Sequence, residues 1–286
     1  MLKNYYKITK PGIIYGNGLS GIAGFFLASP WPVDLRLFIA MLVGLSLVIA
    51  SACVFNNIYD REMDSKMERT KNRSLASGKI KPSHAIIFAV ILLILGVLSL
   101  SLFANLYPLY FALLGFLIYV FLYTPLKTKT VHATLIGALS GAMPPVVGYI
   151  AVTNSLDAAA IIVFLILVFW QMPHFYAIGI RRLEDYKSVK APILPASGGV
   201  KKTKVYTLVY TLAFLVSAFA LSFYKYTGFV YLTVMIAVGF YWLKLVWDGF
   251  KSTDDKVWSK KVFLFSLVVL LVWCAIIPID RLINLK

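Results

Sequence analysis

The sequence predicts an all-α polytopic membrane protein, folded as a single integral-membrane domain over residues 1–286. Three observations support this fold class. Hydrophobic residues make up 60% of the chain, and the mean hydropathy is +0.82. Charged residues make up only 14%, whereas soluble domains average about 25%. Most of the long apolar runs reach the length of about 20 residues that a helix needs to cross a bilayer.

Nine apolar segments can be read along the chain, and we expect each of them to form a transmembrane helix. Seven or eight spans are the alternative, because the first and fourth segments are short and only Leu106 separates the third from the fourth. The segments are residues 13–29, 35–57, 83–105, 107–124, 131–152, 158–180, 203–223, 227–247 and 261–279.

Basic residues are distributed unevenly over the loops that these segments define. With nine spans, the N-terminus and the even-numbered loops share one side of the membrane. That side receives all of the 28 Lys and Arg residues except Arg36, Lys225, Arg281 and Lys286. Because cytoplasmic loops are enriched in Lys and Arg, we expect the N-terminus in the cytoplasm and the C-terminus outside.

The net charge of +16 does not indicate a nucleic-acid-binding protein. The basic residues fall in short segments between apolar runs, and no basic domain lies outside the spans. Cys53 and Cys274 both lie in apolar runs and show neither a metal-binding spacing nor a disulfide framework. The first residues resemble neither a cleavable signal nor a transit peptide. A bacterial plasma membrane is therefore the simplest location.

A polar segment follows the second apolar run and carries the strongest functional signal. On a helix with about 100° per residue, Asn56, Asp60 and Asp64 fall within an arc of about 80°. Asn57 lies seven residues before Asp64 and joins this arc, whereas Glu62 points to the opposite side. Carboxylate and amide oxygens suit Mg²⁺, which proteins often share with the phosphates of a substrate. The alternative is an ordinary solvated loop rich in salt bridges.

The sixth apolar segment leads into a second charged stretch. If its helix continues, His174, Arg181 and Asp185 lie within about 40° of one another, although a kink at Pro173 would weaken this alignment. The guanidinium fork of an arginine matches the oxygens of a diphosphate. The alternatives are a histidine that is simply packed within the membrane and an Asp185 that pairs with Arg181 or Arg182.

The two longest loops, residues 58–82 and 181–202, each follow an even-numbered span. They lie four spans apart, as in a weak duplication of a four-helix unit, and we expect them to share one site. Within the second loop, the proline-flanked stretch 191–195 is either a stiff cap over that site or a plain connector.

These features together fit chemistry on a lipid diphosphate. Mg²⁺ and basic side chains would neutralise the departing diphosphate and so stabilise charge that develops at the reacting centre. A dry, aromatic-lined cavity would shield an allylic cation from water and stabilise it by cation–π contact. The alternative from another class is a transporter, but transporter sites lie near the bilayer midplane. The charged stripes of this chain lie at the cytoplasmic rim instead.

Five stretches resemble the UbiA-type intramembrane prenyltransferases, and more narrowly the heme-type branch of that family. They cover the chain from the first span to Pro195, and the rest adds mainly apolar helices. In chain order they are TKPGIIYGN, NNIYDREMDSKMERTKNR, TLIGALSGAMPPVVGY, WQMPHFYAI and RRLEDYKSVKAPILP.

The resemblance implies nine helices around a central cavity that opens laterally to lipid. It also implies Mg²⁺-dependent transfer of the farnesyl group of farnesyl diphosphate to the C2 vinyl group of protoheme IX, which gives heme O and diphosphate. An enzyme of the same fold that prenylates an aromatic acid such as 4-hydroxybenzoate is the alternative. Heme A synthase or a terminal oxidase is the protein partner to consider within the bilayer.

The resemblance also assigns roles to residues. Asn56, Asp60 and Asp64 match the first Mg²⁺–diphosphate motif, with Asn57 beside them. Asp185 matches the acidic position of the second motif, where Val189 stands in place of a further acid. The expected catalytic residues are Asp60, Asp64 and Asp185, and these three with Asn56 are expected to hold the metal. The residues expected to bind substrate are Asn56, Asn57, Lys71, Arg73, Lys127, Arg181 and Lys190, with His174 near the macrocycle of protoheme.

Overall fold

The computed structural model describes residues 2–68 and 70–283, and all regular secondary structure in these ranges is helical. A π-helix, η1, joins α5 to α6, and a 3₁₀-helix, η2, follows α13. The elements are α1 (Leu2–Ile8), α2 (Pro11–Ala28), α3 (Leu35–Lys66), α4 (Pro82–Phe103), α5 (Leu106–Leu117), η1 (Ile118–Tyr123), α6 (Thr124–Leu126), α7 (Ala133–Gly141), α8 (Met143–Thr153), α9 (Ala158–Arg181), α10 (Leu183–Ser188), α11 (Leu194–Ser197), α12 (Gly199–Phe223), α13 (Phe229–Asp248), η2 (Gly249–Lys251) and α14 (Asp255–Ile283).

All nine predicted segments correspond to helical stretches of the bundle. Eight stretches are long and apolar enough to cross a membrane, within residues 2–68 and 70–283. The other is α2, a glycine-rich helix of 18 residues that contains Asn17. This helix packs beside the others, against α8, α3 and α14. The predicted fold class is confirmed, and the count of nine spans is approximate.

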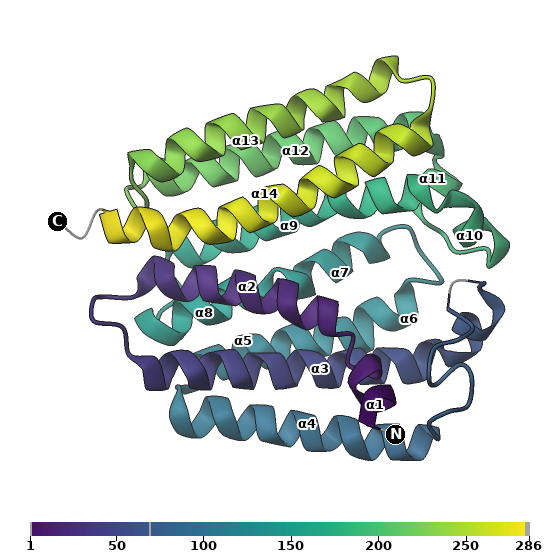
Figure 1. Cartoon of the computed structure of the whole chain (residues 1–286), viewed down its shortest axis with the longest axis horizontal. Helices are drawn as coiled ribbons and strands as arrows, with labels where there is room; N and C mark the ends of the chain where they lie inside the picture. The colour runs from purple at the N-terminus through teal and green to yellow at the C-terminus, as the bar shows by residue number, and fades with distance from the viewer. Residues whose placement is uncertain (1, 69, 284–286) are drawn as a thin grey trace.

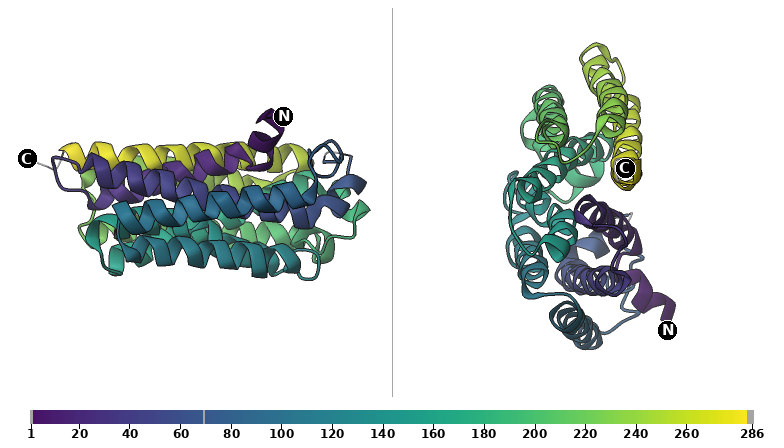
Figure 2. Two further views of the ribbon diagram at one scale, coloured as in Figure 1. Left: turned by 90° about the horizontal axis from the view of Figure 1, so that it is seen from below. Right: turned by 90° about the vertical axis from the view of Figure 1, so that its left-hand side faces the viewer.

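The long helices lie side by side along one common direction (Figures 1 and 2). Contacts between neighbours form a closed circuit, which links α2, α3, α4, α5, α7, α9, α12, α13, α14 and again α2. The predicted span 131–152 is divided into α7 and α8, with Ala142 at the junction just before two consecutive prolines. The division follows from the proline pair, which lacks the backbone N–H groups that would continue the helical hydrogen bonds.

Helix α3 is the longest element and carries the first polar segment. Asp34 caps its N-terminus by accepting a hydrogen bond from a backbone N–H of the first turn at 3.0 Å. The helix does not end with the apolar run but continues through the polar segment. Asn56, Asp60 and Asp64 therefore share one helix, and all three line the same cavity, as their spacing predicts.

Helices α2 and α8 approach each other closely because glycines face the opposing backbone. A Cβ atom on Gly24 would overlap the carbonyl group of Pro145, and one on Gly148 would overlap the carbonyl oxygen of Gly21. Small residues commonly allow membrane helices to pack at such short range. The contact holds α2 against the middle of the bundle, where it forms one wall of the site.

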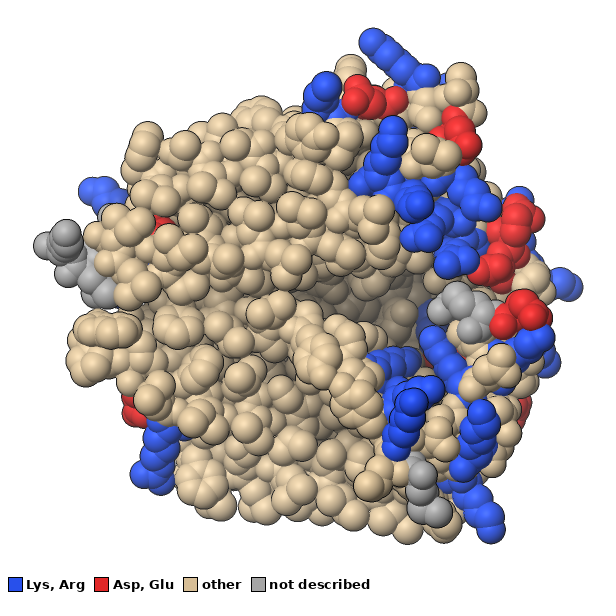
Figure 3. All heavy atoms as spheres, viewed as in Figure 1, with Lys and Arg blue, Asp and Glu red and all other residues tan. Residues whose placement is uncertain are grey.

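Basic side chains gather at one end of the bundle, and the opposite end carries few charges (Figure 3). The start of the chain lies toward the basic end, whereas α14 finishes at the other end (Figure 1). An odd number of crossings places the two ends of a chain in this way. The polar segments that follow α3 and α9 thus meet at the same end.

Replacing Gly148 with Ala should destabilise the fold, because the new methyl group meets backbone atoms of α2 rather than a flexible side chain. We expect a loss of about 1–3 kcal/mol, the usual effect of overpacking, and thermal unfolding in detergent measures it. Gly12→Ala is the matched control, since a Cβ there has no atom within 4 Å. Equal unfolding midpoints for the two variants would contradict the close α2–α8 contact.

Candidate active site

A cavity of about 560 Å³ lies toward the basic end of the bundle. Its walls come from α2, α3, α5, η1, α7, α8, α9 and α14, together with parts of the segment 186–195 that runs from α10 into α11. Figure 3 shows the surface hollowed between the two halves of the bundle, next to the basic side chains. Both long loops contribute to the wall, and the stretch 191–195 lines the cavity. The volume is that of a typical small-molecule site, about 300–1,000 Å³.

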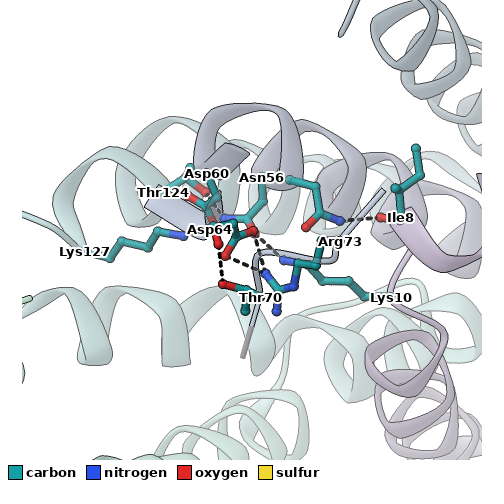
Figure 4. Close-up of polar contacts among 10 residues, drawn as sticks. Ile8, Lys10, Asn56, Asp60, Asp64, Thr70, Arg73, Thr124 and Lys127 are labelled. Atoms are coloured by element: carbon teal, nitrogen blue, oxygen red, sulfur yellow. Dashed lines mark hydrogen bonds and ion pairs between the residues drawn. The ribbon is translucent and has the colours of Figure 1, made fainter. Parts of the chain in front are cut away.

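Two buried carboxylates define the polar end of this cavity. The side chains of Asp60 and Asp64 are each only 5% exposed. Lys127 forms an ion pair with Asp60, and one Nη of Arg73 donates to both carboxylate oxygens of Asp64, at 2.8 and 3.1 Å. Figure 4 shows the two cations approaching the carboxylates from opposite sides. Because an unpaired buried charge is strongly destabilising, each carboxylate depends on its cation.

Asn56 connects α3 to two other elements. Its amide nitrogen donates to the hydroxyl of Thr124 at 3.0 Å, and that hydroxyl donates to the carbonyl of Tyr119 at 2.7 Å. Its amide oxygen accepts a hydrogen bond from Lys10, which precedes α2 (Figure 4). Lys10 lines the cavity. Desolvation by the surrounding protein lowers the pKa of its ammonium group to about 8. A third basic group therefore reaches the polar end.

The oxygen atoms at this end match the ligands that Mg²⁺ prefers. Asp60 Oδ1 is buried and has no hydrogen-bond partner within residues 2–68 and 70–283. Asp64 supplies a second carboxylate one turn further along α3. The described residues hold no group of three or more His, Cys, Asp or Glu side chains that could bind a metal. Mg²⁺ usually needs only one or two carboxylates, because water and substrate phosphates complete its shell.

Aromatic rings line the cavity next to the carboxylates. Tyr119 and Tyr123 stack with ring centroids 5.2 Å apart, and Lys127 Nζ lies 5.9 Å from the centroid of the Tyr123 ring. Phe116 and Trp170 form further parts of the wall. The faces of such rings attract positive charge without hydrating it. The cavity can therefore accommodate a carbocation as well as a lipid chain.

His174 lines the cavity from α9. Pro173 precedes it within the same helix, which continues to Arg181. The imidazole ring stacks on Trp170 with centroids 4.9 Å apart, and its Nδ1 lies 2.8 Å from the hydroxyl of Ser266 on α14. The histidine is thus packed against protein, as the simpler alternative proposed, and it also faces the cavity.

Asp185 does not join the carboxylate pair, and the expected continuous helix is wrong at this point. Helix α9 ends at Arg181, Arg182 adopts φ −112° and ψ 25°, and α10 begins a new helix. Asp185 therefore leaves the face that carries His174. Its side chain is 38% exposed, lies 3.8 Å from Arg182, and does not line the cavity. A catalytic or metal-binding role for Asp185 remains a prediction.

Four of the expected substrate-binding residues also lie outside the wall of the main cavity, namely Asn57, Lys71, Arg181 and Lys190. Asn57 donates to the carbonyl of Ile8 at 2.7 Å, and Lys71 pairs with Glu68 at 2.6 Å. The guanidinium carbon of Arg181 lies 5.8 Å from the ring centroid of Phe263. Lys190 is an exposed loop residue with φ 53°. Their roles in binding substrate remain predictions.

Three residues that contact the site are not among those that the sequence predicts, namely Lys10, Thr124 and Ser266. The TKPG stretch was a usable signal for Lys10, because it places a lysine directly before the proline that starts a helix. Thr124 and Ser266 act through contacts 68 and 92 residues away along the chain. Local spacing and periodicity do not predict contacts between residues so far apart in the sequence.

Replacing Arg73 with Ala should weaken the binding of Mg²⁺–farnesyl diphosphate roughly tenfold or more, the usual effect of losing a charge-assisted hydrogen bond. The variant removes a guanidinium group that is expected to bind the diphosphate, and it leaves the buried Asp64 without its cation. Calorimetric titration of the detergent-solubilised protein measures the affinity. Lys66→Ala serves as the control, because this exposed lysine lies on the same segment. An unchanged affinity in Arg73→Ala would exclude Arg73 from the diphosphate site.

The comparisons with known proteins agree with this architecture. A digeranylgeranylglyceryl phosphate synthase structure matches with a TM-score of 0.82 and 23% identity, covering 98% of each chain. A UbiA homolog from Archaeoglobus fulgidus, bound to GPP and Mg²⁺, matches with a TM-score of 0.74 and 13% identity, covering 96% of this chain and 99% of that one. At such low identities these matches show a shared fold.

Sequence comparisons reach further. Protoheme IX farnesyltransferase 2 of Pseudomonas fluorescens strain Pf0-1 is 50% identical over 280 residues, which cover 98% of this chain and 95% of the relative. Protoheme IX farnesyltransferase of Yersinia pseudotuberculosis serotype O:1b is 47% identical over 281 residues, with the same coverage. Residues 18–268 match the model of the UbiA prenyltransferase family. The chain therefore belongs to the UbiA prenyltransferase family.

Proposed function

We propose that this chain transfers the farnesyl group of farnesyl diphosphate to the C2 vinyl group of protoheme IX, and so forms heme O. One structural observation carries the proposal. Asp60 and Asp64 are buried, each with its own cation, at the end of an aromatic-lined cavity inside a membrane bundle. Relatives with 50% and 47% identity over nearly the whole chain bear the name of this activity, which supports protoheme as the acceptor.

The polar end of the cavity binds the diphosphate in this proposal. Asp60 and Asp64 hold Mg²⁺, with Asn56 beside them, and the metal supplies charge neutralisation to the leaving diphosphate. Three cationic side chains at this end donate hydrogen bonds to the phosphate oxygens. These side chains are Lys10, Arg73 and Lys127. A UbiA homolog of the same fold was solved with GPP and Mg²⁺, which supports a divalent metal here.

The farnesyl chain occupies the apolar part of the cavity. The C–O bond at its allylic C1 breaks, and the electron pair leaves with the diphosphate. The terminal vinyl carbon of protoheme then bonds to C1, and the positive charge moves to the vinyl carbon next to the porphyrin. Water adds to that carbon and releases a proton, which completes the hydroxyethylfarnesyl group. Tyr119 and Tyr123 line the path, exclude bulk water and stabilise the cation.

Protoheme enters from the bilayer and lies against α9, with His174 near its macrocycle. Ionisable residues inside membrane helices usually mark functional sites rather than lipid-facing surface. His174 faces the cavity from α9, about two turns before Arg181 at the end of that helix. An acceptor bound there would lie against the same cavity that holds the farnesyl chain.

We further propose that the basic end and the N-terminus face the cytoplasm of a bacterium, in accordance with the positive-inside rule. Lys71, Arg181, Asp185 and Lys190 lie around this end outside the cavity wall. In this proposal the basic residues of this group, Lys71, Arg181 and Lys190, attract the anionic substrate toward the cavity by long-range electrostatics. Heme A synthase or a terminal oxidase is the partner we propose for receiving the product within the bilayer.

Purified protein supplied with Mg²⁺, farnesyl diphosphate and protoheme should form heme O, detected by chromatography of the extracted pigments. Asp64→Ala should lower turnover by about 10²-fold or more, because it removes charge stabilisation at the leaving group. Glu62→Ala is the matched control, since this side chain lies on the same helix and is 81% exposed. Full turnover in Asp64→Ala would contradict the metal site.

The same assay tests the acceptor. Supplying 4-hydroxybenzoate in place of protoheme should give no prenylated product. Prenylation of the aromatic acid without formation of heme O would contradict the proposed acceptor and leave the diphosphate site intact.

A further inference from the structure

The two ring nitrogens of His174 have different surroundings. Nδ1 lies 2.8 Å from the hydroxyl oxygen of Ser266, a fully buried residue of α14. Nε2 forms no hydrogen bond with any residue in the ranges 2–68 and 70–283, and the ring lines the cavity. One nitrogen is thus engaged by the protein, and the other is available to a ligand.

The hydroxyl of Ser266 determines which ring nitrogen carries the proton. This hydroxyl has a single proton and lies 2.6 Å from the backbone carbonyl oxygen of Phe263. A carbonyl oxygen can only accept, so the hydroxyl proton points to it. The contact between Ser266 and Nδ1 is then a hydrogen bond only if Nδ1 donates. Neutral His174 therefore has its N–H at Nδ1 and a lone pair at Nε2.

Packing around the ring fixes its orientation. Trp170 stacks against it with an interplanar angle of 26°, and Phe263 lies on it with a centroid distance of 5.0 Å. The indole N–H of Trp170 also donates to the backbone carbonyl of Ser266 at 2.8 Å. Both the side chain and the backbone of Ser266 thus bind α14 to α9. The imidazole has little freedom to rotate or to exchange tautomers.

We propose that Ser266 is a positioning residue, which presents the Nε2 lone pair of His174 to the iron of bound protoheme. The proposal rests on the proposed function, because it takes protoheme as the acceptor. Histidine commonly binds metals as neutral imidazole, and its other nitrogen usually donates to an oxygen atom that sets the tautomer and the ring orientation. Ser266 and His174 have this arrangement. An axial bond of this kind fixes the macrocycle, and so limits where its vinyl groups lie in the cavity.

Heme binding can be measured separately from turnover. Purified variants are titrated in detergent with protoheme IX reduced by dithionite, and both the absorption spectrum and the Kd are recorded. The unmodified protein should give the bands of histidine-ligated ferrous heme. Ser266→Ala should weaken binding roughly 10- to 100-fold, the usual effect of losing the group that orients a metal-binding histidine.

Two further serine variants keep this test informative. Ser266→Thr retains the hydroxyl and should retain both the band positions and the affinity. Ser266→Cys keeps the volume but offers only a weak acceptor, so it should behave as Ser266→Ala does. It replaces the alanine variant if that protein does not fold.

His174→Asn distinguishes ligation from a structural role. The side-chain amide of an asparagine can still donate to Ser266, but nothing in it replaces Nε2. We expect this variant to lose the histidine-ligated spectrum and to retain Mg²⁺–farnesyl diphosphate binding. An unchanged spectrum and Kd in His174→Asn, or in Ser266→Ala, would overturn the proposal.

These outcomes can be told apart from failure of the proposed function. If the unmodified protein shows the histidine-ligated spectrum but forms no heme O, farnesyl transfer is wrong and the contact of His174 with heme stands. If heme O forms and Ser266→Ala keeps the original spectrum and Kd, the positioning role alone is wrong.

Discussion

The candidate active site depends on the neutralisation of two carboxylates that lie inside an apolar bundle. Asp60 and Asp64 are almost inaccessible to solvent, and each is held by one cation. Such buried pairs contribute little net stability compared with apolar packing, because desolvating both charges offsets their attraction. Apolar residues would therefore serve the fold as well or better. We propose instead that the pairs serve the site, because their cations can move from the carboxylates to the phosphates of a bound diphosphate.

The cations that neutralise this pair come from different segments of the chain. Lys127 reaches Asp60 from the segment after η1, where the π-helix shifts the register of the chain and Thr124 accepts a hydrogen bond from Asn56. Short π-helical stretches often accompany functional sites. Arg73 reaches Asp64 from the loop that follows α3. The close packing of α2 on α8 brings a third cation from the start of the chain.

Much of this architecture can be predicted from local features of the sequence. Apolar runs of membrane-spanning length predict the helices, and a spacing of four residues places Asp60 and Asp64 on one helical face. The same extrapolation fails for Asp185, because a single change of backbone conformation at Arg182 ends α9. The spacing of residues in the sequence does not predict that a helix ends at one position within a charged stretch. The bonds of Asn56 to Thr124 and of His174 to Ser266 join distant segments, and only the folded chain shows them.

The central claim is that Asp60 and Asp64 hold a divalent metal together with the diphosphate. A crystal of the protein with Mn²⁺ and a non-reactive thio analogue of farnesyl diphosphate would locate the metal by its anomalous scattering. We expect one Mn²⁺ peak in contact with both carboxylates and with phosphate oxygens, and we expect Lys127 and Arg73 to turn from the carboxylates to the phosphates. A metal bound elsewhere, with both ion pairs to Asp60 and Asp64 intact, would contradict it.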